Sequence, residues 1–231
     1  MVRRPDRPSD LPPELAALLS QLSLDQMREL VPQLLARAGD TLIQELKAKP
    51  PSRRRPRRDP ATMVLRIDLV GVKPPIWRRV EVPSTLMLDQ VHDLIQVLFG
   101  WTDSRLHRFA LGSSVWDRHA EAFLCPYDVE EGDVDGGVGA RQVRLDEVLA
   151  EPGEVLRYVY DYGDAWLHVL KLETIRPEPC VHPAVLAGRY EAPEEYRGRF
   201  EDPHREPLDL DDLNESVADW ATGRGVATPR G

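Results

Sequence analysis

The segment VLRYVYDYGDAWLHVLKLE, residues 155–173, constrains the fold more than any other stretch. Apolar and aromatic residues alternate with polar ones on both sides of Tyr162 and Gly163, which predicts an antiparallel β-hairpin. With these two residues as the loop, Gly163 supplies the positive φ that tight turns need. This register opposes Asp161 to Asp164 and gives two further pairs, Val159–Trp166 and Arg157–His168.

The negative charges of two opposed aspartates must be compensated, because like charges directly across a hairpin repel. Turn N–H groups, an arginine such as Arg78 or Arg79, or a metal ion can provide this compensation. Asp side chains commonly accept hydrogen bonds from turn amides. We therefore interpret the turn as an architectural clamp, with Trp166 packed below it.

A metal site at the turn is the alternative. Asp164 and His168 lie four residues apart on one strand, roughly 13 Å at ~3.3 Å per residue, so they cannot share an ion. An ion there needs both aspartates and a ligand from elsewhere, with three candidates: His107, His119 and Asp128. Two carboxylates and a histidine suit Mn, Mg or Zn. We expect His168 itself to be buried, since apolar residues share its face.

The chain divides into an arm, a linker and a body. Residues 1–48 form the arm, in which 11–48 show helical spacing of apolar residues. Residues 49–60, KPPSRRRPRRDP, hold four prolines and five arginines and should be extended and poorly ordered. The body spans 61–222, and 223–231 should be a disordered tail.

The sequence of the body predicts both strands and helices. Strands are expected at 64–70, 76–82 and 106–111, besides the hairpin. A helix should start at Ser84 or Thr85 and end at Gly100. A closing helix should turn four residues inward: Leu210, Leu213, Val217 and Trp220. Because regular βαβ units and a glycine-rich phosphate loop are missing, the pattern predicts an α+β fold: a compact mixed sheet with packed helices, preceded by the helical arm.

The charge is unevenly distributed. Residues 1–60 hold 12 basic and 8 acidic residues, whereas the remainder holds 18 basic and 31 acidic residues, a net charge of −13. A body this acidic is a poor binder of phosphate backbones. The arginines of 53–58 leave two interpretations open: a solvated tether, which we favour, or an electrostatic contact with nucleic acid.

Compartment and membrane association follow from composition. No apolar run approaches the ~20 residues that cross a bilayer, and the N-terminus lacks a secretion-signal pattern. The two cysteines, Cys125 and Cys180, make no disulfide framework. These features predict a cytoplasmic protein with reduced thiols and no membrane partner.

Several large aromatic side chains suggest a surface role as an alternative to a core role. Together they would line an aromatic groove beside Arg78 and Arg79, which would bind peptides or unpaired bases by stacking. The residues concerned are Trp77, Trp101, Trp116, Trp166, Tyr158 and Tyr160. For Trp77 and Trp166, which lie on strands, we favour the core.

Four motifs occur in a characteristic order: PPIWRRVEVP, LIQVLFGW, LHRF and YVYDYGDAWLHVLKLE. Their combination, over residues 62–173, resembles the plasmid pRiA4b open-reading-frame-3 family, also labelled insertion-element passenger proteins. The resemblance implies a compact α+β domain of plasmid and mobile-element type, without a settled activity. Members usually carry a cysteine- and proline-rich stretch after the hairpin, whereas this chain has Cys180 alone there.

Two functional hypotheses follow. In the first, which we favour, the protein is a non-enzymatic accessory module that recognises a protein or nucleic-acid partner and needs no cofactor. In the second, it is a metal-dependent, phosphoesterase-like hydrolase centred on Asp161 and Asp164, with His107 as a further ligand. The candidate functional cluster comprises Asp161, Gly163, Asp164, Trp166, His168, Tyr160, Trp77, Arg78, Arg79 and His107.

Overall fold

The structure, a computed structural model, describes residues 52–117, 119–132, 137–195 and 205–223. The chain divides between Lys49 and Pro50 into two units, and all described residues belong to the second. The expected helical arm lies outside the described residues, as does the expected tail apart from Gly223. In the part that is described, no helix is long and apolar enough to cross a bilayer.

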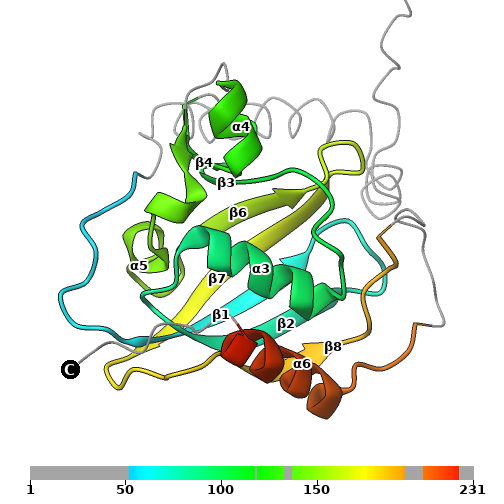
Figure 1. Cartoon of the computed structure of the whole chain (residues 1–231). Coiled ribbons are helices and arrows are strands. Elements are labelled where there is room, and N and C mark those ends of the chain that lie inside the picture. The colour runs from blue at the N-terminus through cyan, green and yellow to red at the C-terminus, as the bar shows by residue number, and fades with distance from the viewer. Residues whose placement is uncertain (1–51, 118, 133–136, 196–204, 224–231) are drawn as a thin grey trace, which may run out of the picture. The chain divides into compact units, whose positions relative to one another are not determined.

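One sheet of eight strands forms the centre of the second unit, in the order β5-β4-β3-β6-β7-β1-β2-β8 (Figure 1). The strands are β1 (Thr62–Leu69), β2 (Ile76–Pro83), β3 (His107–Leu111), β4 (Glu121–Leu124), β5 (Val138–Gly139), β6 (Val155–Tyr160), β7 (Trp166–Arg176) and β8 (Ala184–Arg189). Strands β4 and β5 are parallel, and every other neighbouring pair is antiparallel. The expected α+β fold with a mixed sheet is therefore confirmed.

Helix α3 (Leu88–Phe99) covers one face of this sheet, which we call the inner face (Figure 1). Its apolar residues recur at helical spacing and are buried: Leu88, Val91, Leu94, Ile95 and Leu98. Burying each such side chain stabilises the fold by about 1.5–3 kcal/mol. The helix ends as expected at Gly100, whose φ of 67° suits glycine.

The start of α3 differs from the expectation. The N-cap is Met87, whose N–H donates to Oε1 of Gln90 at 2.9 Å. Ser84 lies before the helix, fully buried, where its Oγ accepts a hydrogen bond from the N–H of Ala61. Ser84 was a plausible cap by residue type, but the backbone N–H of Ala61 uses its hydroxyl.

The other helices lie at the margins of the sheet. Helix α4 (Pro126–Glu131) follows β4, and α5 (Leu145–Val148) precedes β6. Helix α6 (Leu210–Gly223) packs on β8 and α3, with Val217 and Ala221 buried. Leu210 is 37% exposed and does not face inward as expected.

The part of the linker that the structure describes, residues 52–60, contacts the body. The N–H of Arg54 donates to the carbonyl of Glu147 at 2.7 Å, and its guanidinium pairs with Glu154. Arg53 pairs with Glu121. The acidic body therefore neutralises two of the arginines that we expected to remain solvated.

Strand β2 alternates between buried and half-buried residues, and this separates two neighbouring arginines. Arg78 is buried on the inner face, where it donates to the carbonyls of Leu98, Trp77, Arg189 and Tyr190. Arg79 lies on the opposite face and pairs with Glu173. Arg78 thus ties the C-terminal end of α3 to the segment that follows β8.

The hairpin between β6 and β7 has a different register from the expected one. Tyr160 pairs with Trp166 and Tyr158 with His168, so the loop spans residues 161–165. Positive φ occurs at Asp161 (56°) and Ala165 (49°), and not at Gly163. The two-residue turn was wrong because the side chain of Asp161 organises a longer loop.

The clamp at this turn is made by one aspartate. Oδ1 of Asp161 accepts the N–H groups of Gly163 and Asp164 at 2.9 and 3.3 Å. Oδ2 lies 3.6 Å from Nε of Arg105, so the compensating arginine is neither Arg78 nor Arg79. Asp164 is exposed, and Trp166 is fully buried.

The two arginines of β2 provide a matched pair for mutation. Arg78→Leu should lower the free energy of unfolding by about 3 kcal/mol, because it leaves several buried carbonyls without a donor. Arg79→Leu removes a partly exposed ion pair and a guanidinium contact with the ring of Trp77, and should cost about 1 kcal/mol. Urea unfolding measures both values, and equal losses would contradict the assigned role of Arg78.

The turn gives a second prediction. Asp161→Ala should cost about 1–3 kcal/mol, because it removes an acceptor of two N–H groups and leaves alanine at positive φ. Asp161→Asn retains an acceptor and tolerates this φ, so it should stay close to the parent. Asp164→Ala should shift stability by no more than about 0.5 kcal/mol. Chemical denaturation of the three variants tests the clamp, which fails if Asp164→Ala is the most damaging.

Candidate functional site

Helix α3 buries two polar residues on its otherwise apolar face. His92 and Gln96 lie one turn apart and are 3% and 4% exposed. Nδ1 of His92 lies 2.7 Å from the hydroxyl of Tyr158 on β6, and Nε2 of Gln96 donates to the same hydroxyl at 3.1 Å. A buried polar group is costly without such partners, so Tyr158 is what allows both residues to face the sheet.

Asp103 closes this network from the loop between α3 and β3. We call residues 101–105 the Asp103 loop. Oδ1 of Asp103 lies 2.7 Å from Nε2 of His92, and its backbone N–H donates to Oε1 of Gln96 at 3.2 Å. Since a carboxylate only accepts, the network assigns the proton of neutral His92 to Nε2, and Nδ1 accepts from Tyr158. Asp103, Gln96, Tyr158 and His92 thus form a closed hydrogen-bonded ring.

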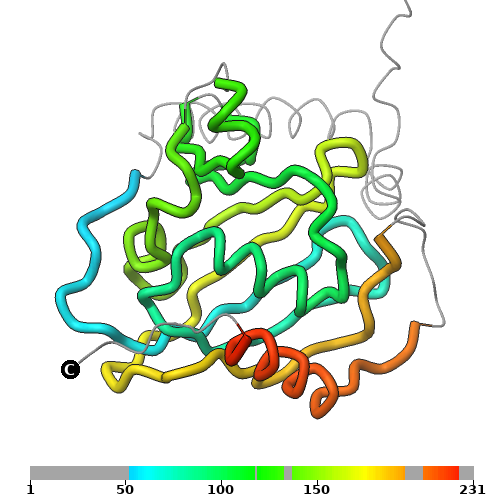
Figure 2. Tube along the Cα trace, in the orientation of Figure 1, coloured from blue at the N-terminus to red at the C-terminus, as the bar shows by residue number. Residues whose placement is uncertain are grey.

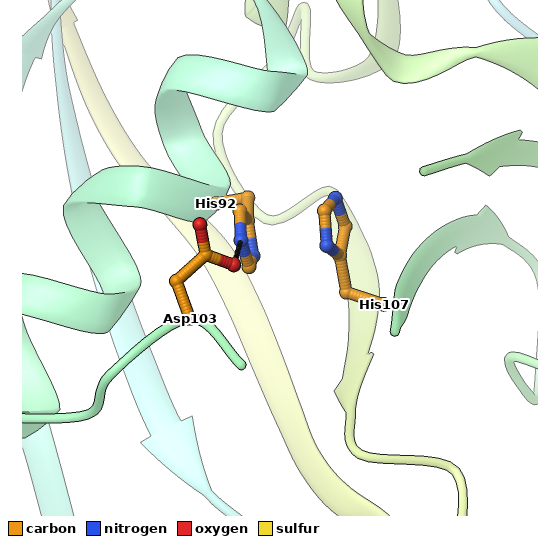
Figure 3. Close-up of side chains that lie close together, drawn as sticks. All are labelled: His92, Asp103 and His107. Carbon is orange, nitrogen blue, oxygen red and sulfur yellow. Dashed lines mark hydrogen bonds and ion pairs between the residues drawn. The ribbon is translucent and has the colours of Figure 1, made fainter. Parts of the chain in front are cut away.

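His107, the first residue of β3, stacks on His92. The ring centroids are 3.4 Å apart and the planes differ by 12° (Figure 3). Burial and the neighbouring His92 lower the pKa of His107 to about 3, against the opposing effect of Asp103. The imidazole is therefore neutral at physiological pH. Its buried Nε2 has no hydrogen-bond partner among the described residues, which leaves one ring nitrogen available to a ligand.

His92, Asp103 and His107 form the one group of potential metal ligands found within the described part of the chain. One donor atom from each lies within 4.8 Å of the others. Two imidazoles and a carboxylate suit zinc, iron and similar transition metals better than magnesium or calcium. Asp103 is about half exposed, whereas both histidines are buried. Solvent therefore reaches the cluster from the carboxylate side.

A second carboxylate, Glu195, holds the Asp103 loop. It is 5% exposed and belongs to the segment 190–195 after β8, which we call the strap. Figure 2 shows the strap in orange beside the green connection from α3 to β3. Four groups donate to Glu195: the N–H and Oγ1 of Thr102 to Oε2, and the hydroxyls of Ser104 and Tyr160 to Oε1. Burial and the hydrogen bond to Glu195 raise the pKa of Tyr160 to about 12.

The inner face brings together only some of the residues expected from the sequence. Tyr160, Trp166, His107 and His168 lie there and are buried. Trp101 contacts three of these rings, with centroids 5.2–5.5 Å from those of Tyr160, Trp166 and His168. His168 is buried as expected, packed edge-on against Phe99.

The remaining expected residues lie elsewhere. Asp161, Gly163 and Asp164 form the hairpin turn, and His107 clusters with His92 and Asp103 instead of joining them. His119 is exposed, and Asp128 accepts from the hydroxyl of Tyr162. Hence the proposed combination of turn aspartates with His107 does not occur in the structure.

The aromatic groove is not formed either. Trp77 is half-buried on the face opposite to α3, under the guanidinium of Arg66. Trp116 is 46% exposed and stacks edge-on against Tyr162. Trp101 and Trp166 are buried on the inner face. Alternation along the strands sends these side chains to opposite faces, so no common groove includes Trp77 and Trp166.

Sequence reasoning missed His92, Gln96, Asp103 and Glu195. His92 and Gln96 could have been noticed in the sequence, since two polar residues four apart interrupt the apolar stripe of an amphipathic helix. Asp103 follows the helix closely but carries no pattern of its own. Glu195 lies 92 residues beyond Asp103, and only the fold brings the two segments together.

Comparisons with known proteins place this fold in a family. A family model described as "Plasmid pRiA4b ORF-3-like protein" matches residues 61–220. The uncharacterised protein y4hQ of Sinorhizobium fredii (strain NBRC 101917 / NGR234) is 36% identical over 114 residues, which cover 49% of this chain. The match spans 54% of that relative, about half of its length.

A solved structure supports the same fold. It is a protein of unknown function, MM3350 from Methanosarcina mazei Go1, with a TM-score of 0.51 and 27% sequence identity. The match covers 61% of this chain and 76% of that protein. With the family match over residues 61–220, the chain belongs to the plasmid pRiA4b ORF-3-like family.

Proposed function

We propose that the protein is a transition-metal-dependent hydrolase whose ion is held by His92, Asp103 and His107. The supporting observation is the convergence of two buried histidines and a solvent-reaching carboxylate within 4.8 Å. This proposal keeps the metal-dependent chemistry considered from the sequence and moves its centre away from Asp161 and Asp164.

Three protein ligands suit a catalytic ion. Structural zinc sites are closed by four protein ligands, whereas catalytic sites keep a position for water or substrate. The half-exposed Asp103 puts that position on the solvent side. An ion held there would lower the pKa of a bound water to about 7, which is the chemistry that hydrolysis needs.

Binding requires a small rearrangement of the side chains. Two ligands on one ion lie about 3.0–3.4 Å apart when each bond is about 2.1 Å. The lone pair of an imidazole nitrogen lies in the ring plane, so the stacked rings must turn to converge on one ion. Nε2 of His107 has no hydrogen bond within the described residues, so turning this ring breaks no bond at that nitrogen. To ligate through Nε2, His92 would move its proton to Nδ1, which would then donate to the hydroxyl of Tyr158, as a ligating histidine usually does to an outer partner.

Metal binding by the full chain, freed of metal with a chelator and carrying no histidine tag, tests this proposal. Titration with Co(II) or Zn(II) should give one ion per chain. His107→Phe, which keeps a ring in the stack, should abolish that stoichiometric binding. His119→Ala and Asp164→Asn are the controls and should bind like the parent. Absence of binding by the parent, or its loss in Asp164→Asn, would refute the assignment.

A binding module for a basic partner is the second candidate. A cleft of about 360 Å³ lies between the end of α3, the strap and α6. Four acidic side chains line it: Glu191, Glu194, Asp209 and Asp212. The carbonyl end of a helix adds negative potential, as does the net charge of −13 in residues 61–231. These features favour a lysine- or arginine-rich protein segment over nucleic acid.

A lysine-rich decapeptide provides the test of this second function. Its binding should weaken several-fold in Asp209→Asn/Asp212→Asn and between 50 and 200 mM salt, because screening reduces such attractions. Asp211→Asn removes one such charge outside the cleft lining and should have little effect. If Asp211→Asn weakens binding as much as the double variant, the attraction is general and the cleft has no such role.

A further inference from the structure

The Asp103 loop is held by Glu195 on both sides of the proposed ligand. Thr102 precedes Asp103 and donates two hydrogen bonds, at 2.9 and 2.7 Å, to one carboxylate oxygen. Ser104 follows Asp103 and donates to the other oxygen at 3.1 Å. From this bracketing we infer that Glu195 is a positioning residue for the metal centre, an inference that rests on the proposed function.

The backbone of Asp103 needs such support. Its φ of 53° lies in the left-handed region, which residues other than glycine adopt uncommonly, although Asp and Asn do so more readily than most. Gln96 accepts its N–H from the side of α3, and Tyr160 accepts the N–H of Ser104 at 2.9 Å. Tyr160 also donates to Glu195. With its backbone held in this way, Asp103 directs its carboxylate to His92 at 2.7 Å.

The charge of Glu195 adds to this effect. The four hydrogen bonds to its carboxylate come from neutral groups, and no lysine or arginine of the described residues forms an ion pair with it. A dication at the cluster would therefore be attracted by Asp103 directly and by Glu195 at longer range. Because coupling is reciprocal, the ion should also tighten the attachment of the strap.

Glu195→Gln tests the positioning role. The amide keeps the size of the side chain but removes its charge and turns one of the two acceptor atoms into a donor, so it cannot accept all four hydrogen bonds. Removing a partner in the outer shell of a metal typically costs 10–100-fold in affinity. We expect that loss for Co(II) in the full chain, together with a changed visible absorption spectrum at saturating Co(II), since Asp103 is displaced. Glu194→Gln, the same charge change next in sequence, should retain the parent affinity and spectrum.

Thr102→Val is a milder second variant in case Glu195→Gln does not fold. It removes one of the four donors at nearly constant shape and should weaken Co(II) binding by about 10-fold. Parent-like affinity and spectrum in the folded variants would overturn the positioning role while leaving the metal proposal standing. A parent protein that binds no metal would instead overturn the proposed function on which this inference depends.

Discussion

The hydrogen-bonded ring around Tyr158 joins three separate parts of the chain. It connects α3 through His92 and Gln96, the Asp103 loop, and strand β6. Each member satisfies a polar group of another, and because His92, Gln96 and Tyr158 are buried, losing one member would leave buried polar groups unpaired. This mutual dependence sets how α3 lies on the sheet and where the loop after it must run.

The candidate site follows from that arrangement. Because the ring fixes His92 and Asp103, β3 delivers His107 against the open face of the imidazole. The strap then covers the loop, with Glu195 accepting bonds from residues on both sides of Asp103. The site thus combines a buried inner part, built on a helix and a strand, with an outer carboxylate near solvent. Such an arrangement suits an ion that buried histidines bind and that solvent reaches from the side of the carboxylate.

Local pattern predicted much of the fold but little of the site. Alternation identified β2, since strand periodicity depends only on neighbours along the chain, but it did not show that Arg78 is buried while Arg79 pairs with Glu173. The predicted hairpin register was wrong, because the side chain of Asp161 stabilises a loop of residues 161–165 in place of the two-residue turn expected at Tyr162 and Gly163. The role of Glu195 could not be predicted from local sequence patterns, because its partners Thr102 and Ser104 are distant in sequence. Long-range hydrogen bonds leave no periodic signal.

Locating the ion in a crystal tests most directly whether His92, Asp103 and His107 bind a metal. Diffraction data collected at the zinc absorption edge, from crystals of the full chain grown with Zn(II), would show the metal as an anomalous peak. One peak is expected about 2.0–2.2 Å from a nitrogen of His92, a nitrogen of His107 and an oxygen of Asp103. A zinc peak at Asp161 and Asp164 instead, or none near His92, would contradict this assignment.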